Sequence, residues 1–337
     1  MVVNNFLRLL ARLCLMACCI GLLPWSSGVA IAASEKGLVV IEKDDFRLRL
    51  AKDVYYLVDP EGTATLDDIR EASTRGAFSR FRNDTLQFGY SNHTYWLRFT
   101  VENQLKERIG EAPADRFYLT VRYPLLDDVR FYSVHASPYG TRVNEQTLGD
   151  SRPFYERVFS TSDLVFPFTL APGARAEIFL KVTSSSSLSL PLYLEPERAF
   201  VGSRFSLDIL DGIYLGITLG LCFYNLFLWL NVRERSYIYY VGFVAVYLLF
   251  NATMSGHTFR FWPDAIAFQQ IAIYFFSIAS AFAAALFGRE FLQLKQHRPG
   301  MYRILSGYML LCLSAMLAVF LVDPHWAAKL NIAITLG

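Results

Sequence analysis

Two long apolar runs joined by a short charged loop constrain the fold of this chain more than any other feature. The first run extends from Ile209 to Leu230 and carries a charge only at Asp211, near its start. The loop Asn231-Val-Arg-Glu-Arg-Ser follows, and the second run extends from Tyr237 to Phe250. Because about 20 apolar residues cross the hydrocarbon core of a bilayer, the stretch from Leu207 to Ser255 predicts a transmembrane hairpin.

The composition excludes several classes of protein. Only 18% of the residues are charged, against about 25% in an ordinary soluble domain, and the net charge of +2 comes without a block of Lys or Arg. We therefore expect no nucleic-acid partner. The five cysteines all lie outside the range from Ala33 to Arg204, which excludes a disulfide framework there, and no Cys/His spacing is typical of a metal site. We expect no cofactor and no metal.

Residues 1–33 have the pattern of a secretory signal peptide. Arg8 and Arg12 supply the basic region, Leu13 to Leu23 the apolar region, and Ala30-Ile-Ala32 the small residues of a cleavage site. The alternative is an uncleaved anchor helix, although the apolar run is shorter than a full span.

Residues 38–194 predict an all-β domain. Tyr95, Leu97, Phe99 and Val101 alternate with polar residues at the period of a strand, and similar runs recur between turn sequences. Only Thr65 to Ser73 is typical of a helix, with Thr65 as its N-cap. We expect a periplasmic sandwich or jelly roll, followed by an α-helical, multi-span membrane domain.

A short charged connector, residues 195–206, is predicted to join the β domain to a membrane module, residues 207–337. The expected spans are residues 209–230, 237–255, 265–286, 304–322 and 326–337. The fifth run has fewer residues than a bilayer crossing needs, so we interpret the chain as a fragment truncated in that helix.

Loop charges predict the orientation in the membrane. Arg233 and Arg235 lie in the first loop and a larger group in the third, whereas the second loop has only Arg260. The third-loop group is Arg289, Lys295, Arg298 and Arg303. The positive-inside rule then puts loops one and three in the cytoplasm and the β domain outside, which predicts a multi-pass protein of the bacterial inner membrane.

Several short motifs carry a family resemblance, and their order is more specific than any one of them. In the β domain they are Tyr95-Trp-Leu-Arg-Phe, Tyr123-Pro-Leu-Leu-Asp127, Gly149-Asp150 with Pro153-Phe154 and Arg157, and Phe166-Pro-Phe. In the membrane module they are Gly212-Ile-Tyr-Leu-Gly216, Tyr224-Asn225, Arg233-Glu-Arg-Ser-Tyr237 and Arg289-Glu-Phe-Leu292. The chain resembles the seven-transmembrane receptors with diverse intracellular signalling modules (7TMR-DISM). This resemblance implies a jelly-roll sensor related to carbohydrate-binding folds, seven spans and a cytoplasmic effector.

Aromatic and basic residues on the polar faces of the strands are the first candidate ligand site. They are Trp96, Arg98, Tyr118, Arg122, Tyr132 and Phe179. Flat aromatic rings beside charged donors suit the apolar faces and hydroxyl rims of a sugar. The alternative is that Trp96 packs beneath a further layer of the sandwich and that the arginines are exposed to solvent at its edge.

Asp150, Arg152, Tyr155 and Arg157 form a second polar cluster beside a turn. Arginine binds carboxylates through two parallel hydrogen bonds, so an acidic ligand is one hypothesis. A set of surface salt bridges is the other.

Small and polar residues in the first two spans predict helix packing. Gly212, Gly216 and Gly220 recur every four residues and so share one helical face, which would let another helix approach closely. Asn225 and Asn251 are expected to form hydrogen bonds between helices. A ligand or ion path is the alternative.

These observations favour a membrane receptor over an enzyme. We expect the partners to be the bilayer and a periplasmic small molecule, with carbohydrate as one class, and leave homodimerisation open. The first alternative is the sensor half of a signalling enzyme, a diguanylate cyclase or histidine kinase. The second is a carbohydrate-active or transport accessory protein that transmits no signal.

Overall fold

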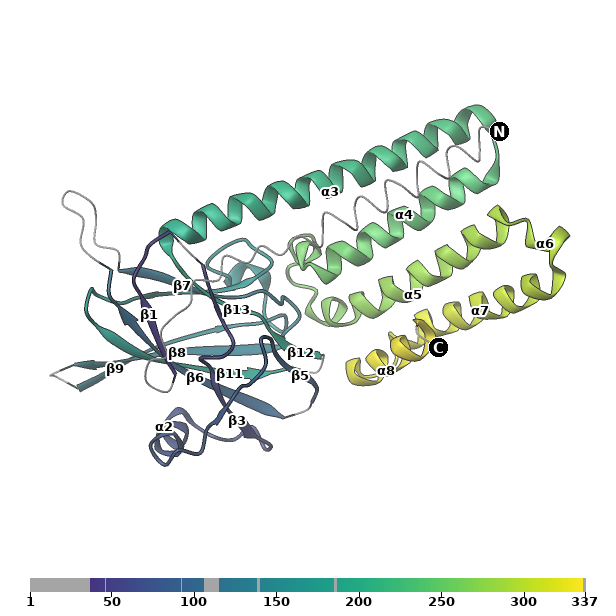
Figure 1. Cartoon of the computed structure of the whole chain (residues 1–337). Coiled ribbons are helices and arrows are strands. Elements are labelled where there is room, and N and C mark those ends of the chain that lie inside the picture. Colours follow the sequence, from purple (N-terminus) through teal and green to yellow (C-terminus); the bar gives the residue numbers. More distant parts are fainter. Residues whose placement is uncertain are drawn as a thin grey trace. The chain divides into compact units, whose positions relative to one another are not determined.

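The computed structural model describes residues 37–45, 47–91, 93–105, 115–137, 140–184 and 187–335. The predicted signal peptide lies outside the described residues. The described residues form a β sandwich followed by a set of helices (Figure 1).

One layer of the sandwich is a seven-stranded sheet, called the large sheet below. Its strands follow the order β4-β3-β6-β11-β8-β9, and β1 pairs in parallel with the end of β6. The strands are β1 (Leu38–Ile41), β3 (Tyr55–Asp59), β4 (Ser79–Arg80), β6 (Thr94–Asn103), β8 (Asp128–Ser137), β9 (Gly140–Leu148) and β11 (Arg175–Thr183).

The second layer is a four-stranded antiparallel sheet, called the small sheet below, with the order β10-β7-β13-β2. Its strands are β2 (Leu48–Leu50), β7 (Arg116–Val121), β10 (Leu164–Thr169) and β13 (Leu192–Pro196). Strands β5 (Leu86–Tyr90) and β12 (Ser187–Leu190) form a separate pair.

The core lies between the two sheets and follows the predicted alternation. Leu97 and Phe99 of β6 are buried in one cluster with Phe117 and Leu119 of β7. Successive strand residues point to opposite faces, so their polar neighbours lie on the two outer faces of the sandwich. The predicted all-β sandwich is confirmed.

A single helix, α2 (Leu66–Thr74), covers part of the outer face of the large sheet. The Thr65 hydroxyl accepts a hydrogen bond from the Asp68 amide, and the Asp68 carboxylate accepts one from the Thr65 amide. This reciprocal capping box starts the helix where the sequence predicted. Ile69 is its buried residue, packed with Trp96 and Phe179 of the sheet.

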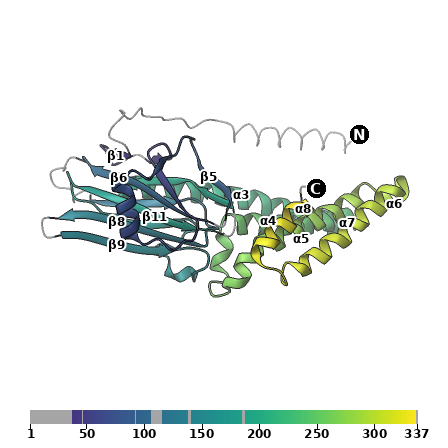
Figure 2. The same ribbon diagram turned by 90° about the horizontal axis from the view of Figure 1, so that it is seen from below.

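Helices make up the rest of the chain, and four of those described are long and apolar enough to cross a membrane. They are α3 (Glu197–Val232), α4 (Arg235–Met254), α5 (Ile266–Phe291) and α7 (Pro299–Ala318). Two views show α4 beside α3 and α5, and α7 beside α5 (Figures 1 and 2). Shorter elements complete the set: η2 (His257–Arg260), α6 (Leu294–His297) and α8 (Pro324–Thr335).

The predicted connector, residues 195–206, is not a separate segment. Strand β13 ends at Pro196 and α3 begins at Glu197. The charged residues of the predicted connector therefore form the first turns of the helix that continues as the first span. Charged residues such as Arg198 and Arg204 end a hydropathy run, but they are good helix formers and do not end a helix. With 36 residues α3 is about 54 Å long, against about 30 Å of hydrocarbon, so a large part of it projects beyond the membrane.

The predicted packing of the first two spans is not seen within the described residues. A side chain built at Gly212, Gly216 or Gly220 would meet no described atom within 4 Å outside its own helix. Asn225 and Asn251 each donate to the carbonyl oxygen four residues earlier in their own helices, at 2.8 and 2.9 Å. One N–H of each amide is therefore bonded within its own helix, and the expected interhelical hydrogen bonds stay a prediction.

Candidate functional site

The residues of the first candidate ligand site do not form one site. Trp96, Arg98 and Tyr132 lie on β6 and β8 of the large sheet, whereas Tyr118 and Arg122 lie on and just after β7 of the small sheet. Their polar faces point away from the shared core and so to opposite sides of the sandwich. The prediction of a single site is wrong because alternation assigns a face within a strand but not the sheet to which the strand belongs.

The aromatic residues on the large sheet are packed beneath α2. Trp96 is fully buried and stacks on Tyr132, with ring centres 5.8 Å apart, and Phe179 is also fully buried. Lys181 lies over the Trp96 ring and donates to the carbonyl oxygen of Gly62 at 2.8 Å. A sugar cannot stack on rings in this position, so the packing alternative holds for them.

Arg98 lies beside this packed group and lines a shallow hollow of about 290 Å³. Its guanidinium donates to Glu177 at 2.7 Å, and residues of α2 form the opposite wall. The full lining is Arg70, Glu71, Ser73, Thr74, Arg98 and Glu177. These groups suit a small polar molecule.

On the opposite side of the sandwich, Tyr118 and Arg122 face the first turns of α3. The Tyr118 ring stacks on Phe200 of α3 at 4.4 Å, and its hydroxyl donates to Glu197 at 3.3 Å. Arg122 lies over the Tyr193 ring of β13. These residues join the small sheet to the helix that becomes the first span.

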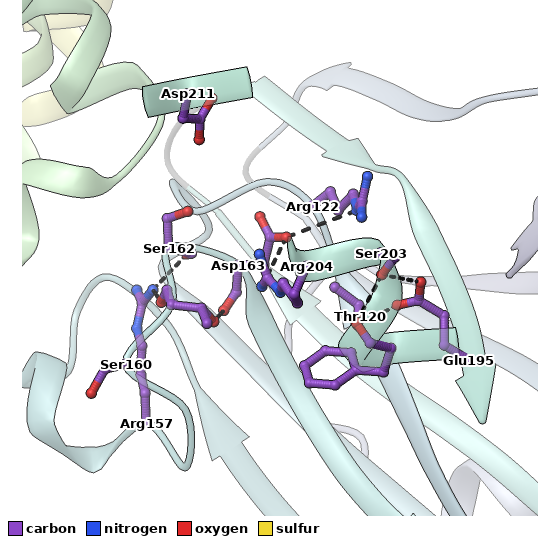
Figure 3. A network of polar contacts seen from close by, with 12 residues as sticks. Thr120, Arg122, Arg157, Ser160, Ser162, Asp163, Glu195, Ser203, Arg204 and Asp211 are labelled. Atoms are coloured by element: carbon purple, nitrogen blue, oxygen red, sulfur yellow. Dashed lines mark hydrogen bonds and ion pairs between the residues drawn. The ribbon is translucent and has the colours of Figure 1, made fainter. Parts of the chain in front are cut away.

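A buried ion cluster lies at the centre of this contact (Figure 3). Asp163, just before β10, is 3.1 Å from Arg204 of α3 and 3.9 Å from Arg122. All three side chains are at most 17% exposed. Burial raises the pKa of Asp163 despite its two arginines, because removing a carboxylate from water outweighs their attraction.

A second group beside it extends the contact along α3. The Glu195 carboxylate, 1% exposed, accepts hydrogen bonds from Ser203 of α3 at 2.8 Å and from Arg47 at 2.7 Å. Thr120 of β7 also donates to it, at 3.5 Å. Figure 3 shows Ser203 directed at Glu195 and Arg204 directed at Asp163, so consecutive residues of α3 hold two acidic side chains of the sandwich.

The second predicted cluster divides into two parts. Arg152 lies on the surface between Asp128 and Glu156, at 3.6 and 3.5 Å, and Tyr155 is 70% exposed. Asp150 and Arg157 are instead buried, at 5% and 8% exposure.

Burial dominates the electrostatics of Asp150 and Arg157. It raises the pKa of Asp150 to about 7, with a further rise from Asp127 and an opposing effect from Arg157. It lowers the pKa of Arg157 to about 10. In the described part of the chain, Asp150 Oδ1 and Arg157 Nε have no hydrogen-bond partner. Asp150 and Arg157 are therefore buried side chains of the domain, and the surface salt bridges expected of this cluster are found at Arg152.

The loop between α4 and α5 packs against this pair. Phe259 of η2 is fully buried with Leu125 and Phe154, and Arg157 lies over its ring. Gln269 of α5 donates to the Asp150 carbonyl oxygen at 3.3 Å.

Gly256 lets the loop between α4 and α5 approach the sandwich closely. It has a φ of 73°, and a Cβ there would lie 2.7 Å from Pro124 and 3.1 Å from Ser162. The sandwich is thus bound to α3 on one side and to the α4–α5 loop on another.

Most of the residues that join the sandwich to α3 were not predicted from the sequence. Glu195, Ser203 and Arg204 fall in the predicted connector, and Asp163 falls in no predicted element. Asp163 and Arg204 are also far apart in the sequence. One signal was available, since three charged residues, Glu195, Glu197 and Arg198, lie close together shortly before a span. Among the described residues, no group of three His, Cys, Asp or Glu side chains could hold a metal ion.

The fold and the apolar helices define a multi-pass membrane protein with a β-rich sensor domain at its N-terminal side. The family model described as 7TMR-DISM extracellular 2 matches residues 51–196, and the model described as 7TM diverse intracellular signalling matches residues 207–337. The chain belongs to the 7TMR-DISM family, which makes it a membrane sensory receptor with an extracellular sensor domain.

Other comparisons add little. A solved structure of TmCBM61 in complex with beta-1,4-galactotriose is similar at 13% identity, over 45% of this chain and 88% of that chain, with a TM-score of 0.20. No curated protein matched the chain.

Proposed function

We propose that this chain is the sensing and membrane part of a bacterial inner-membrane receptor. Its sandwich lies in the periplasm and binds a small polar molecule, and α3 carries the resulting change across the membrane. The observation that supports this most directly is the continuity of α3, which begins at Glu197 within the sandwich and continues without a break to Val232.

The rigidity of the connection is the physical basis of the proposal. A flexible linker would let the sandwich reorient without effect on the first span. Here Arg204 and Ser203 hold α3 to buried acidic groups, so a shift of the small sheet must either move the helix or break these contacts. A ligand drives such a shift only through its different affinity for the two arrangements.

We propose the hollow between α2 and Arg98 as the ligand site. Its charged and hydroxyl groups match the hydrogen-bonding groups of a small polar molecule, carbohydrate being one class. The stacking surface expected of Trp96 is not part of this proposal, since that ring is buried.

A screen of the full chain in lipid nanodiscs would test binding. Glycans and small polar metabolites would be ranked by the rise in unfolding temperature, and Arg98→Ala should abolish the shift for the molecule that binds. Arg142→Ala, an exposed substitution on β9 away from the hollow, is the matched control. Equal binding by Arg98→Ala and wild type would exclude this hollow.

Cysteine cross-linking between α3 and α4 would test transmission. These two helices pack along each other, so Tyr214→Cys of α3 and Tyr247→Cys of α4 would be paired in a background without native cysteines. The bound molecule should change the cross-linking rate, and Arg204→Ala should remove that change while binding persists. Ser206→Ala is the control, because the Ser206 hydroxyl donates to the carbonyl oxygen of Gly202 in the same helix and not to the sandwich. An unchanged rate at saturation would refute transmission through α3.

A further inference from the structure

The loop of residues 154–162 carries exposed apolar side chains on a rigid frame. Tyr155 is 70% exposed and Val158 is 62% exposed, whereas their neighbours Phe154 and Arg157 are buried. The Arg157 guanidinium donates to the carbonyl oxygens of Thr161 and Ser162, at 3.1 and 2.6 Å. The apolar side chains are therefore held outward by internal contacts.

The same loop is bonded to the segment that joins two membrane spans. Arg260 donates to the carbonyl oxygen of Ser160, and the Phe154 amide donates to the carbonyl oxygen of Pro263 at 3.4 Å. These two bonds flank Phe261 and Trp262 on both sides.

Phe261 and Trp262 stand at the membrane boundary by the order of the chain. They lie between the end of α4 at Met254 and the start of α5 at Ile266, both of which are candidate spans. Phe261 is 78% exposed. Trp and Tyr at the ends of spans occupy the headgroup region of a bilayer, where an apolar ring and a polar edge are both accommodated; Trp262 and Tyr155 are residues of this kind.

We infer that the 154–162 loop is itself a membrane-contact surface, which inserts Tyr155 and Val158 into the outer interface of the bilayer that α4 and α5 cross. The partner is lipid because the loop is continuous, through two hydrogen bonds, with a segment that lies at that interface. This goes beyond the proposed receptor function, which requires only that the sandwich be joined to the helices. It gives the sensor a direct contact with the lipid surface, next to the buried Asp150–Arg157 pair.

Depth-dependent quenching in the full chain tests this inference. Tyr155→Cys, Phe261→Cys and Val143→Cys would each be made in a cysteine-free background, labelled with an environment-sensitive fluorophore and placed in nanodiscs with or without brominated lipid. Val143 is the matched control, since it is 43% exposed on β9 of the same sandwich. Val158→Cys provides a second probe of the loop if the Tyr155 variant does not fold.

The expected result is a loss of emission with brominated lipid at Tyr155, Val158 and Phe261 and none at Val143. Quenching at Phe261 alone would overturn the inference, as would quenching at no site or at all sites, including Val143. A probe at Tyr155 that is shielded equally in detergent and in nanodiscs, without quenching, would instead indicate a protein partner and would also overturn it.

Discussion

The buried carboxyl of Asp150 makes the stability of the chain depend on pH in a direction opposite to that of most acidic residues. Its pKa in the folded protein is raised to about 7, whereas an unfolded aspartate has a pKa of about 3.9. Between these two values the folded state binds more protons than the unfolded state. The contribution of Asp150 to the unfolding free energy is therefore largest below the pKa of the unfolded state, and it is lost as the pH rises through the pKa of the folded state.

The size of the effect follows from the two pKa values. Ionisation of Asp150 in the folded state should remove about 4 kcal/mol in total, of which about 2.5 kcal/mol is lost between pH 5 and pH 8. Asp150→Asn carries no ionisable group at this position and should not show that loss. The substitution also changes the buried surroundings of Arg157 and so shifts the variant's stability at every pH; only the slope against pH measures the titration of Asp150.

Equilibrium unfolding of the full chain in detergent micelles, followed by tryptophan fluorescence from pH 5 to pH 8, measures this slope. The difference in unfolding free energy between Asp150→Asn and wild type should change by about 2.5 kcal/mol in favour of the variant as the pH rises. Asp67→Asn, at a side chain that is 94% exposed, controls for the loss of one carboxylate. Parallel curves for Asp150→Asn and wild type would refute the reasoning.

Three further substitutions test the packing on which the site depends. Trp96→Ala should cost about 3–5 kcal/mol of unfolding free energy, because it empties the space between α2 and the large sheet; a loss near zero in chemical denaturation would contradict the burial of that ring. Gly149→Ala should destabilise by about 1–3 kcal/mol, since a Cβ there collides with the Asp127 carbonyl oxygen, and unchanged thermal unfolding would exclude this close approach. Thr65→Ala should cost about 1 kcal/mol through loss of the α2 cap while Thr65→Ser retains most of it; equal midpoints for the two variants would argue against the capping box.

The candidate site could be predicted only in part from the sequence. The residues that line the hollow and the ion cluster include Arg98 and Arg122, which the polar faces of the strands had singled out. Their partners Glu177 and Asp163 could not be predicted, because each lies more than 40 residues away along the chain. The same holds for Arg204, the second partner of Asp163. A charge run beside a span indicated a connector, and only the structure showed it to be the start of α3.

By itself the sequence determined the faces of individual strands, the cap of α2 and the apolar helices, because each depends on residues within a few positions of one another. The period of two put Leu97 and Phe99 inward on β6, and the lengths of the apolar runs predicted the spans. Only the tertiary structure decided that Trp96 is covered by α2 and that Tyr118 faces α3 on the opposite side of the sandwich. Strand pairing and layer packing are made by contacts between distant segments, and a local pattern of polarity is the same whether water, a ligand or another element covers the face.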